Sequence, residues 1–159
     1  MEWKRALLLL GDDHGFLELK GQKEMNHISI ATEKLVSSES VEEEVLIVED
    51  DPDLREMVQW FLEDEGFVVK TAGDGKEALD CAIVNKPSLV LLDMTLPVID
   101  GYGVAAGLQK VYGNHLPILT MTADGHAVEK AGRIGAIGYL CKPFELDALV
   151  DAVRAALGG

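Results

Sequence analysis

The feature that most limits what this chain can fold into is an apolar run that ends in a single acid. Residues 89–92 are all apolar, they lead directly into Asp93, and Pro87 and Pro97 bracket the segment. An unbroken apolar run of this length predicts a strand over 88–93 that is buried on both faces of a sheet. Because open α/β sheets bind their ligands at the C-terminal ends of such strands, Asp93 is the first candidate for a reactive side chain.

Strand-like and helix-like segments alternate on both sides of this run. The expected strands are 45–48, 67–69, 88–93, 116–121 and 137–141. The expected helices run from Pro52 to a stop at Gly66, and then over 76–85, 102–111, 126–134 and a last segment within 146–157, with a turn at 71–75. This alternation predicts an α/β fold, a doubly wound five-stranded parallel sheet with strand order 2-1-3-4-5 and helices on both faces.

Composition narrows the class of partner. The chain has 159 residues, 48% of them hydrophobic, and a formal net charge of −14. Such a charge disfavours direct contact with nucleic acid or an anionic membrane, and it favours a divalent cation or a basic surface on another protein. We expect a cytoplasmic protein without membrane insertion, in which Cys81 and Cys141 are reduced thiols in apolar surroundings.

Residues 1–44 differ from the rest of the chain. From 21 to 44 the sequence is polar and lacks sustained periodicity, so we expect a disordered N-terminal extension followed by one domain over 45–159. Residues 7–19 echo residues 45–57 in an apolar run, an acid pair and the apolar positions that follow. A chance match, or a natural start at Met25, explains this echo more simply than the remnant of a second domain.

Polar side chains follow several of the expected strands, and a parallel sheet brings those strand ends to one edge. They are the acids of 49–51 after the first strand, Asp93 after the third, Thr122 after the fourth and Lys142 after the fifth. Crowded carboxylates repel one another unless a cation neutralises them, and oxygen ligands suit Mg²⁺ best. Lys142 and the Thr122 hydroxyl are then free to hold an anion.

The same strand ends carry motifs whose order and spacing are typical of one family. The motifs are 45–51, 91–94 with 96–97 and 100–101, 121–123, and 138–140 with 142–144. On these motifs, residues 45–157 resemble the receiver domain of two-component response regulators. The resemblance implies a flavodoxin-like receiver fold and, because no output domain follows in this sequence, a stand-alone regulator of the chemotaxis type.

The resemblance also implies a role for each acid. Asp93 would be the phosphoacceptor, which attacks the phosphohistidine of a sensor kinase and becomes an acyl phosphate. Asp50, Asp93 and the backbone carbonyl of Thr95 would bind Mg²⁺, with Glu49 acting largely through metal-bound water. Asp51 is expected to be an ordinary helix cap.

Three further residues take roles from the resemblance. Lys142 would pair with Asp93 and then with the phosphoryl group, and Thr122 would hydrogen-bond a phosphoryl oxygen. Tyr139 would move inward with Thr122, although a buried core aromatic is an alternative for this residue. The resemblance also implies a cis Lys142–Pro143 peptide. Thr122 and Lys142 are 20 residues apart, fewer than is usual in the family, so the intervening helix with Gly132 should be short.

The expected function is phosphorelay signalling. A sensor histidine kinase or a histidine phosphotransfer protein would donate the phosphoryl group, and a downstream effector protein would read the changed surface of a monomer or weak dimer. The alternative is a relay intermediate that passes the phosphate onward. A Mg²⁺-dependent phosphatase of related topology is disfavoured, because such enzymes carry a second aspartate where this chain has Thr95. We therefore expect a phosphoacceptor that is not an enzyme beyond self-catalysed phosphorylation and dephosphorylation.

Overall fold

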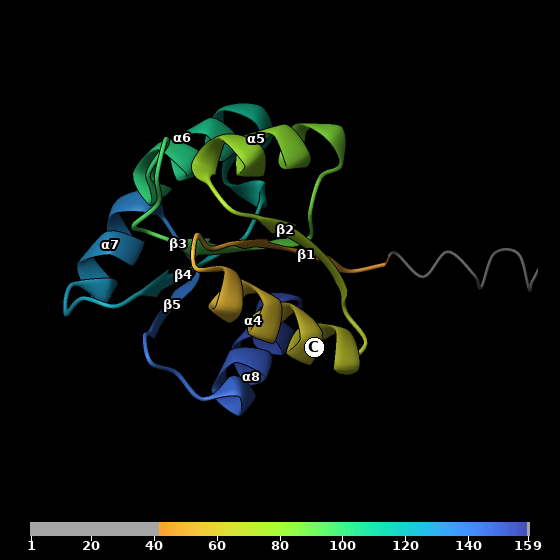
Figure 1. The fold of residues 1–159 in the computed structure, drawn as a ribbon. Helices are drawn as coiled ribbons and strands as arrows, with labels where there is room; N and C mark the ends of the chain where they lie inside the picture. Colours follow the sequence, from red (N-terminus) through yellow and green to blue (C-terminus); the bar gives the residue numbers. More distant parts are fainter. Residues whose placement is uncertain (1–41, 159) are drawn as a thin grey trace, which may run out of the picture. The chain divides into compact units, whose positions relative to one another are not determined.

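The computed structural model describes residues 42–158, so the predictions made for residues 1–41 lie outside the described part. Strands and helices alternate along that part, as the ribbon in Figure 1 shows. The elements are β1 (Glu44–Val48), α4 (Pro52–Asp64), β2 (Val68–Ala72), α5 (Gly75–Val84), β3 (Leu89–Asp93), α6 (Gly101–Tyr112), the 3-10 helix η1 (Gly113–His115), β4 (Ile118–Thr122), α7 (Ala127–Ile134), β5 (Gly138–Cys141) and α8 (Leu146–Ala156).

The five strands form one parallel sheet in the order β2-β1-β3-β4-β5, which confirms the predicted topology. Every residue of β3 is buried, as expected for a strand covered on both faces. The register pairs Asp93 with Met121 on β4, and Thr122 with Cys141 on β5. The C-terminal ends of the strands therefore meet at one edge of the sheet.

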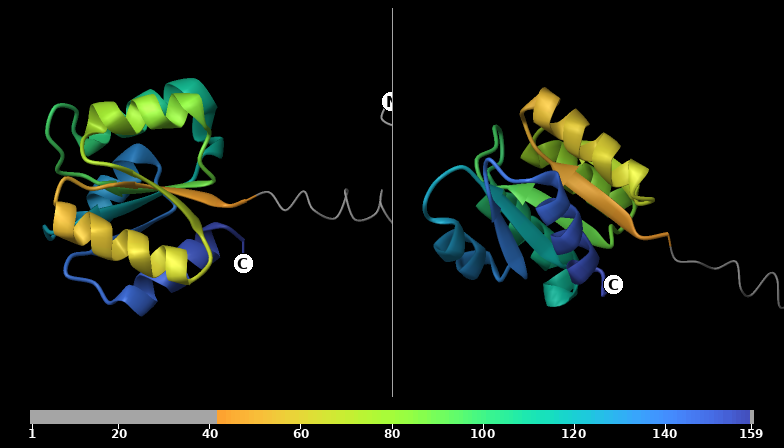
Figure 2. Two further views of the ribbon diagram at one scale, coloured as in Figure 1. Left: turned by 45° about the vertical axis from the view of Figure 1, so that its right-hand side comes forward. Right: turned by 90° about the horizontal axis from the view of Figure 1, so that it is seen from below.

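Helices cover the sheet in two layers. Figures 1 and 2 show α5 and α6 on one face and α4 and α8 on the other. Successive residues of β1 and β3 point to opposite faces, so each strand contributes to both cores. The first core contains Leu46, Val48, Val90, Leu92, Val104, Leu108 and Ile134. The second contains Val45, Ile47, Val58, Leu62, Leu89, Leu91, Leu149 and Val153.

Local sequence signals set the start and end of helix α4. The Asp51 side chain accepts hydrogen bonds from the backbone N–H groups of Asp53 and Leu54, at 3.0 and 3.2 Å, and Pro52 occupies the first helical position. Gly66 follows the helix with a φ of 92°, a conformation that glycine adopts without strain. The capping role predicted for Asp51 is confirmed, and this cap fixes where β1 turns into the helix.

The structure corrects two predictions. Thr71 and Ala72 belong to β2 rather than to a turn, because pairing with Ile47 and Val48 extends the strand to the sheet edge. Cys141 is exposed rather than packed in apolar surroundings, because it lies on the edge strand β5.

Helix α7 has eight residues and ends at Gly135, which has a φ of 65°; the prediction of a short helix is confirmed. None of the helices within residues 42–158 is long and apolar enough to cross a membrane.

Candidate functional site

Three carboxylates converge at the C-terminal edge of the sheet. Glu49 and Asp50 follow β1 and Asp93 ends β3, and one oxygen from each lies within 4.8 Å of the others. Glu49 and Asp93 are 1% and 5% exposed, whereas Asp50 is exposed to solvent. Two carboxylates buried this close together need a positive charge nearby. The cluster offers hard oxygen ligands with one side open to water, which fits a Mg²⁺ ion.

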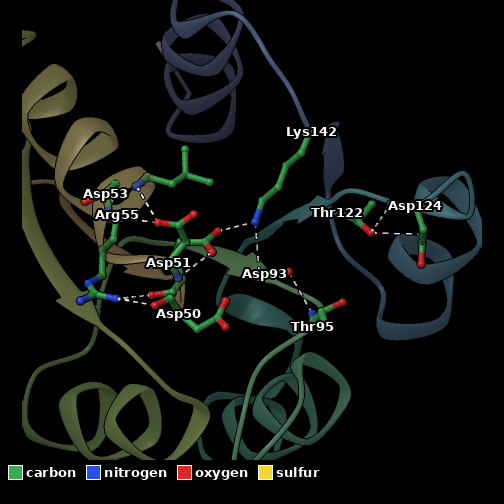
Figure 3. A network of polar contacts seen from close by, with 11 residues as sticks. Asp50, Asp51, Asp53, Arg55, Asp93, Thr95, Thr122, Asp124 and Lys142 are labelled. Carbon is green, nitrogen blue, oxygen red and sulfur yellow. Dashed lines mark hydrogen bonds and ion pairs between the residues drawn. The ribbon is translucent and has the colours of Figure 1, made fainter.

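Lys142, which directly follows β5, supplies a positive charge to this cluster (Figure 3). Its Nζ lies 2.5 Å from Glu49 Oε2 and 3.1 Å from Asp93 Oδ2. Its backbone N–H donates to the carbonyl of Thr122 at 2.8 Å, and the peptide bond to Pro143 is cis, as predicted. Lys142 is thus tied to β4 through its backbone while its side chain reaches across to β1 and β3.

Burial and the neighbouring charges shift the pKa values of Glu49 and Lys142. Burial raises the pKa of Glu49, and this outweighs the hydrogen bonds from Lys142 and from the Asp51 N–H that favour its ionised form. Burial alone would lower the pKa of Lys142, but its contacts with Glu49 and Asp93 outweigh burial and the pKa is raised. Lys142 therefore stays charged at neutral pH and is held between two acids.

The Asp93 carboxylate is held on its second oxygen by the loop that follows β3. The N–H of Thr95 donates to Asp93 Oδ1 at 2.9 Å. The start of α6 packs tightly behind this loop at Gly101, which leaves no room for a side chain. A Cβ added there would lie 2.6 Å from Met94 Cα and 2.8 Å from Asp93 O. Asp100 caps that helix through a 2.8 Å hydrogen bond from the Gly103 N–H. A closely packed turn thus orients the predicted nucleophile.

Thr122 lies at the other side of the site, and Tyr139 lies on the neighbouring strand β5, opposite Thr120. Thr122 is buried at the end of β4, and its hydroxyl donates to Asp124 Oδ1 at 3.2 Å. Asp124 in turn forms an ion pair with Lys130 of α7, and that contact lowers the pKa of Asp124. Tyr139 on β5 is 45% exposed, so the alternative of a buried core aromatic is wrong for this structure.

Arg55 belongs to the site but was not predicted from the sequence. From α4 its Nη1 donates to the backbone carbonyls of Glu49 at 2.6 Å and of Asp50 at 3.4 Å. The signal available in the sequence for this role was a long cationic side chain near the start of the helix that follows the acids after β1. Six of the residues predicted for the site lie at the C-terminal strand ends or in the turns after them; they are Glu49, Asp50, Asp93, Thr95, Thr122 and Lys142. The seventh, Tyr139, is the second residue of β5 and pairs with Thr120 inside the sheet.

This geometry has a counterpart among known proteins. A family model described as the response regulator receiver domain matches residues 45–154. The chain belongs to this family. Its receiver domain is therefore a component of two-component signalling, as the motifs indicated.

Relatives of known sequence place the receiver domain within longer chains. Response regulator MprA of Mycobacterium sp. (strain KMS) is 40% identical over 115 residues, which are 71% of this chain and 50% of that protein. Transcriptional regulatory protein PrrA of Mycobacterium tuberculosis (strain ATCC 25618 / H37Rv) is 38% identical over 115 residues, 71% of this chain and 49% of that protein. The chain spans about half the length of these curated relatives.

Solved structures share the fold. Chemotaxis protein CheY4 of Vibrio cholerae is 32% identical with a TM-score of 0.66, covering 72% of this chain and 98% of that one. Response regulator protein TrrA of Thermotoga maritima, solved in complex with Mg²⁺ and BeF, is 32% identical with a TM-score of 0.66, covering 72% and 99%. Both likenesses support the receiver fold of the described domain.

Proposed function

We propose that this receiver domain accepts a phosphoryl group on Asp93 from a phosphohistidine and then changes the surface that it presents to another protein. The observation that carries the proposal is the buried Asp93 carboxylate, which shares Lys142 with Glu49 and lies within 4.8 Å of Glu49 and Asp50. A carboxylate in this setting has a fixed orientation and a cation beside it. Both properties suit a nucleophile that must approach an anionic phosphoryl group.

In the proposed step a carboxylate oxygen of Asp93 attacks phosphorus. The new O–P bond gives an acyl phosphate, the P–N bond to the donor imidazole breaks, and the imidazole nitrogen takes up a proton. Lys142 would follow the developing charge from Asp93 to the phosphoryl oxygens, since its Nζ already lies 3.1 Å from Asp93 Oδ2. Thr122 would supply a hydroxyl to another phosphoryl oxygen.

The cation in this proposal is Mg²⁺. Asp50, Asp93 and the carbonyl of Thr95 would bind it, with Glu49 acting through metal-bound water. The three-carboxylate cluster supports this assignment by its charge and its hard oxygen donors. When bound there, Mg²⁺ would supply positive charge to neutralise the equatorial phosphoryl oxygens. The complex of TrrA with Mg²⁺ and BeF is a related case in a structure of the same fold.

The proposed readout involves Thr122 and Tyr139. A phosphoryl group adds about two negative charges and strong acceptor oxygens at the site. Thr122 would turn toward them and leave its contact with Asp124, and the exposed Tyr139 ring would move into the vacated space. The surface around β5 and its neighbouring helices would then differ between the two states.

The domain itself is proposed to act on proteins rather than on nucleic acid. Its donor would be a sensor histidine kinase or a histidine phosphotransfer protein, and its target an effector protein in the cytoplasm. The net charge of −14 of the full chain supports this choice, although relatives such as PrrA are named transcriptional regulators. Passing the phosphate onward in a relay is the second candidate. In neither case is the domain an enzyme acting on a separate substrate.

The test is phosphorylation with acetyl phosphate and MgCl₂, followed by intact mass. We expect the wild-type protein to gain one phosphoryl group, and we expect no gain in Asp93→Ala or without the metal. Asp147→Asn, which changes an exposed acid at the start of α8, is the matched control and should be labelled like wild type. A gain that persists in Asp93→Ala, or no gain in the wild type, would refute the assignment.

A further inference from the structure

Arg55 makes contacts that neither the family motifs nor the proposed phosphoryl transfer use. Its backbone N–H donates to the carbonyl of Asp51 at 2.9 Å, the first hydrogen bond of helix α4. Its side chain turns back from the helix toward the end of β1 and is half-buried there. Nη1 then donates to the carbonyl oxygens of Glu49, at 2.6 Å, and Asp50, at 3.4 Å.

These two carbonyls belong to Glu49 and Asp50, the two acids of the carboxylate cluster that follow β1. Glu49 is held in addition by its N–H, which donates to Ala72 O at 3.1 Å, and by its carboxylate, which accepts from Lys142. Asp50 is exposed, and its position depends on the turn between β1 and α4. The Arg55 side chain, which comes from helix α4, holds this turn through its hydrogen bonds to the two carbonyls.

We propose that Arg55 is a positioning residue for the cation site: it fixes the Glu49–Asp50 turn so that the Asp50 carboxylate faces Asp93. The proposal rests on the proposed function, because it concerns the Mg²⁺ site of that same reaction. Arg55 acts through the backbone and touches neither the phosphoryl group nor the reacting atoms. Groups that orient metal ligands in this way typically change metal affinity by about tenfold or more when they are removed.

A purely electrostatic role for Arg55 predicts the opposite result. Figure 3 shows Arg55 and Lys142 on opposite sides of the acid cluster. If Arg55 served only as a positive charge, its removal would make the cluster more negative and would tighten Mg²⁺ binding. A replacement that keeps the charge but shortens the donor separates the two roles, because both hydrogen bonds come from Arg55 Nη1 and the lysine ammonium ends a shorter side chain.

The packing around Arg55 provides a second way to disturb it. A Cβ at Gly73, in the turn between β2 and α5, would lie 3.3 Å from Arg55 Nη1. Gly73→Ala therefore crowds the guanidinium without deleting it. The Gly73 N–H donates to Glu77 Oε2 at 2.6 Å and so holds this turn, and the end of the Arg55 side chain is the group that would give, by a few tenths of an ångström.

The experiment is a titration of the whole chain with MgCl₂, with no phosphodonor, followed by amide chemical shifts in NMR. We expect Arg55→Lys to weaken Mg²⁺ binding by about tenfold, and Gly73→Ala to weaken it in the same direction. Arg154→Met is the matched control, because Arg154 pairs with Glu65 away from the acids, and it should bind Mg²⁺ like wild type. Arg55→Met measures the charge contribution by comparison with Arg55→Lys.

The outcomes separate this proposal from the proposed function. Wild-type Mg²⁺ affinity in both Arg55→Lys and Gly73→Ala would overturn the positioning role, whether or not the wild-type protein is phosphorylated. Tighter binding in Arg55→Met, together with an unchanged Arg55→Lys, would assign Arg55 a charge role alone and would also overturn it. If Arg55→Lys does not fold, Gly73→Ala decides. Failure of the proposed function would appear separately, as no phosphorylation of the wild type at saturating MgCl₂.

Discussion

Removing the Lys142 charge should destabilise this protein in the absence of a metal ion. Lys142 Nζ lies 2.5 Å from Glu49 and 3.1 Å from Asp93, and the three side chains are 17%, 1% and 7% exposed. Lys142→Met keeps most of the side-chain volume but leaves two buried carboxylates without their cation. Breaking a buried ion pair by removing one partner costs about 3–5 kcal/mol, and the open side of this cluster places the expected loss near the lower value, about 3 kcal/mol.

The chain offers a matched control for this substitution. Lys76 pairs with Asp80 at 2.6 Å on helix α5, so the contact distance is similar, but the two side chains are 69% and 62% exposed. Water and salt screen such a pair, and exposed ion pairs contribute little to stability. Lys76→Met should therefore leave the stability close to that of the wild type.

Urea unfolding in EDTA measures the difference. With a slope of about 1.5 kcal/mol per molar urea, a loss of about 3 kcal/mol lowers the unfolding midpoint by about 2 M. Added MgCl₂ should recover part of this loss, because a bound cation neutralises the acids in place of Lys142 and stabilises only the folded state. Equal midpoints for Lys142→Met and Lys76→Met in EDTA would refute the argument that burial makes the Lys142 ion pairs contribute more to stability than the exposed Lys76 pair.

Three further predictions concern glycines and cysteines. Gly132→Ala should stabilise the protein by about 1 kcal/mol in urea unfolding, since an added Cβ on helix α7 meets no atom within 4 Å. Gly101→Ala should instead destabilise it by about 2 kcal/mol, because its Cβ would lie 2.6 Å from Met94 Cα, and an unchanged midpoint would contradict this packing. Iodoacetamide should modify the exposed Cys141 before Cys81, as peptide mass mapping would show. Burial raises the pKa of Cys81, so less of its thiol is ionised near neutral pH and its labelling should increase as the pH rises. Faster labelling of Cys81 than of Cys141 near neutral pH would contradict this prediction.

Much of the fold could be predicted from local patterns. The apolar run before Asp93 indicated a strand buried on both faces, and all of β3 is buried. Asp51, Pro52 and Gly66 marked the start and end of α4, because caps and turns depend on residues only a few positions apart. The alternation of strands and helices, with right-handed crossovers, then left the observed strand order as the expected one.

Other features depend on neighbours that are distant in the sequence. The C-terminal end of β2 at Ala72 is set by pairing with β1, and the exposure of Cys141 is set by the place of β5 at the edge of the sheet. No local pattern encodes either neighbour. A run such as 71–75 therefore looks like a turn until the partner strand is known.

The candidate site divides in the same way. The sequence by itself determined which acids, hydroxyl and lysine stand at strand ends, because the position of a residue relative to a strand is a local property. Only the tertiary structure decided that Lys142 lies closer to Glu49 than to Asp93, and that Arg55 donates to the backbone carbonyl of Glu49. Those contacts depend on the sheet register, the packing of α4 and the direction of long side chains, which form only when segments far apart in the chain come together.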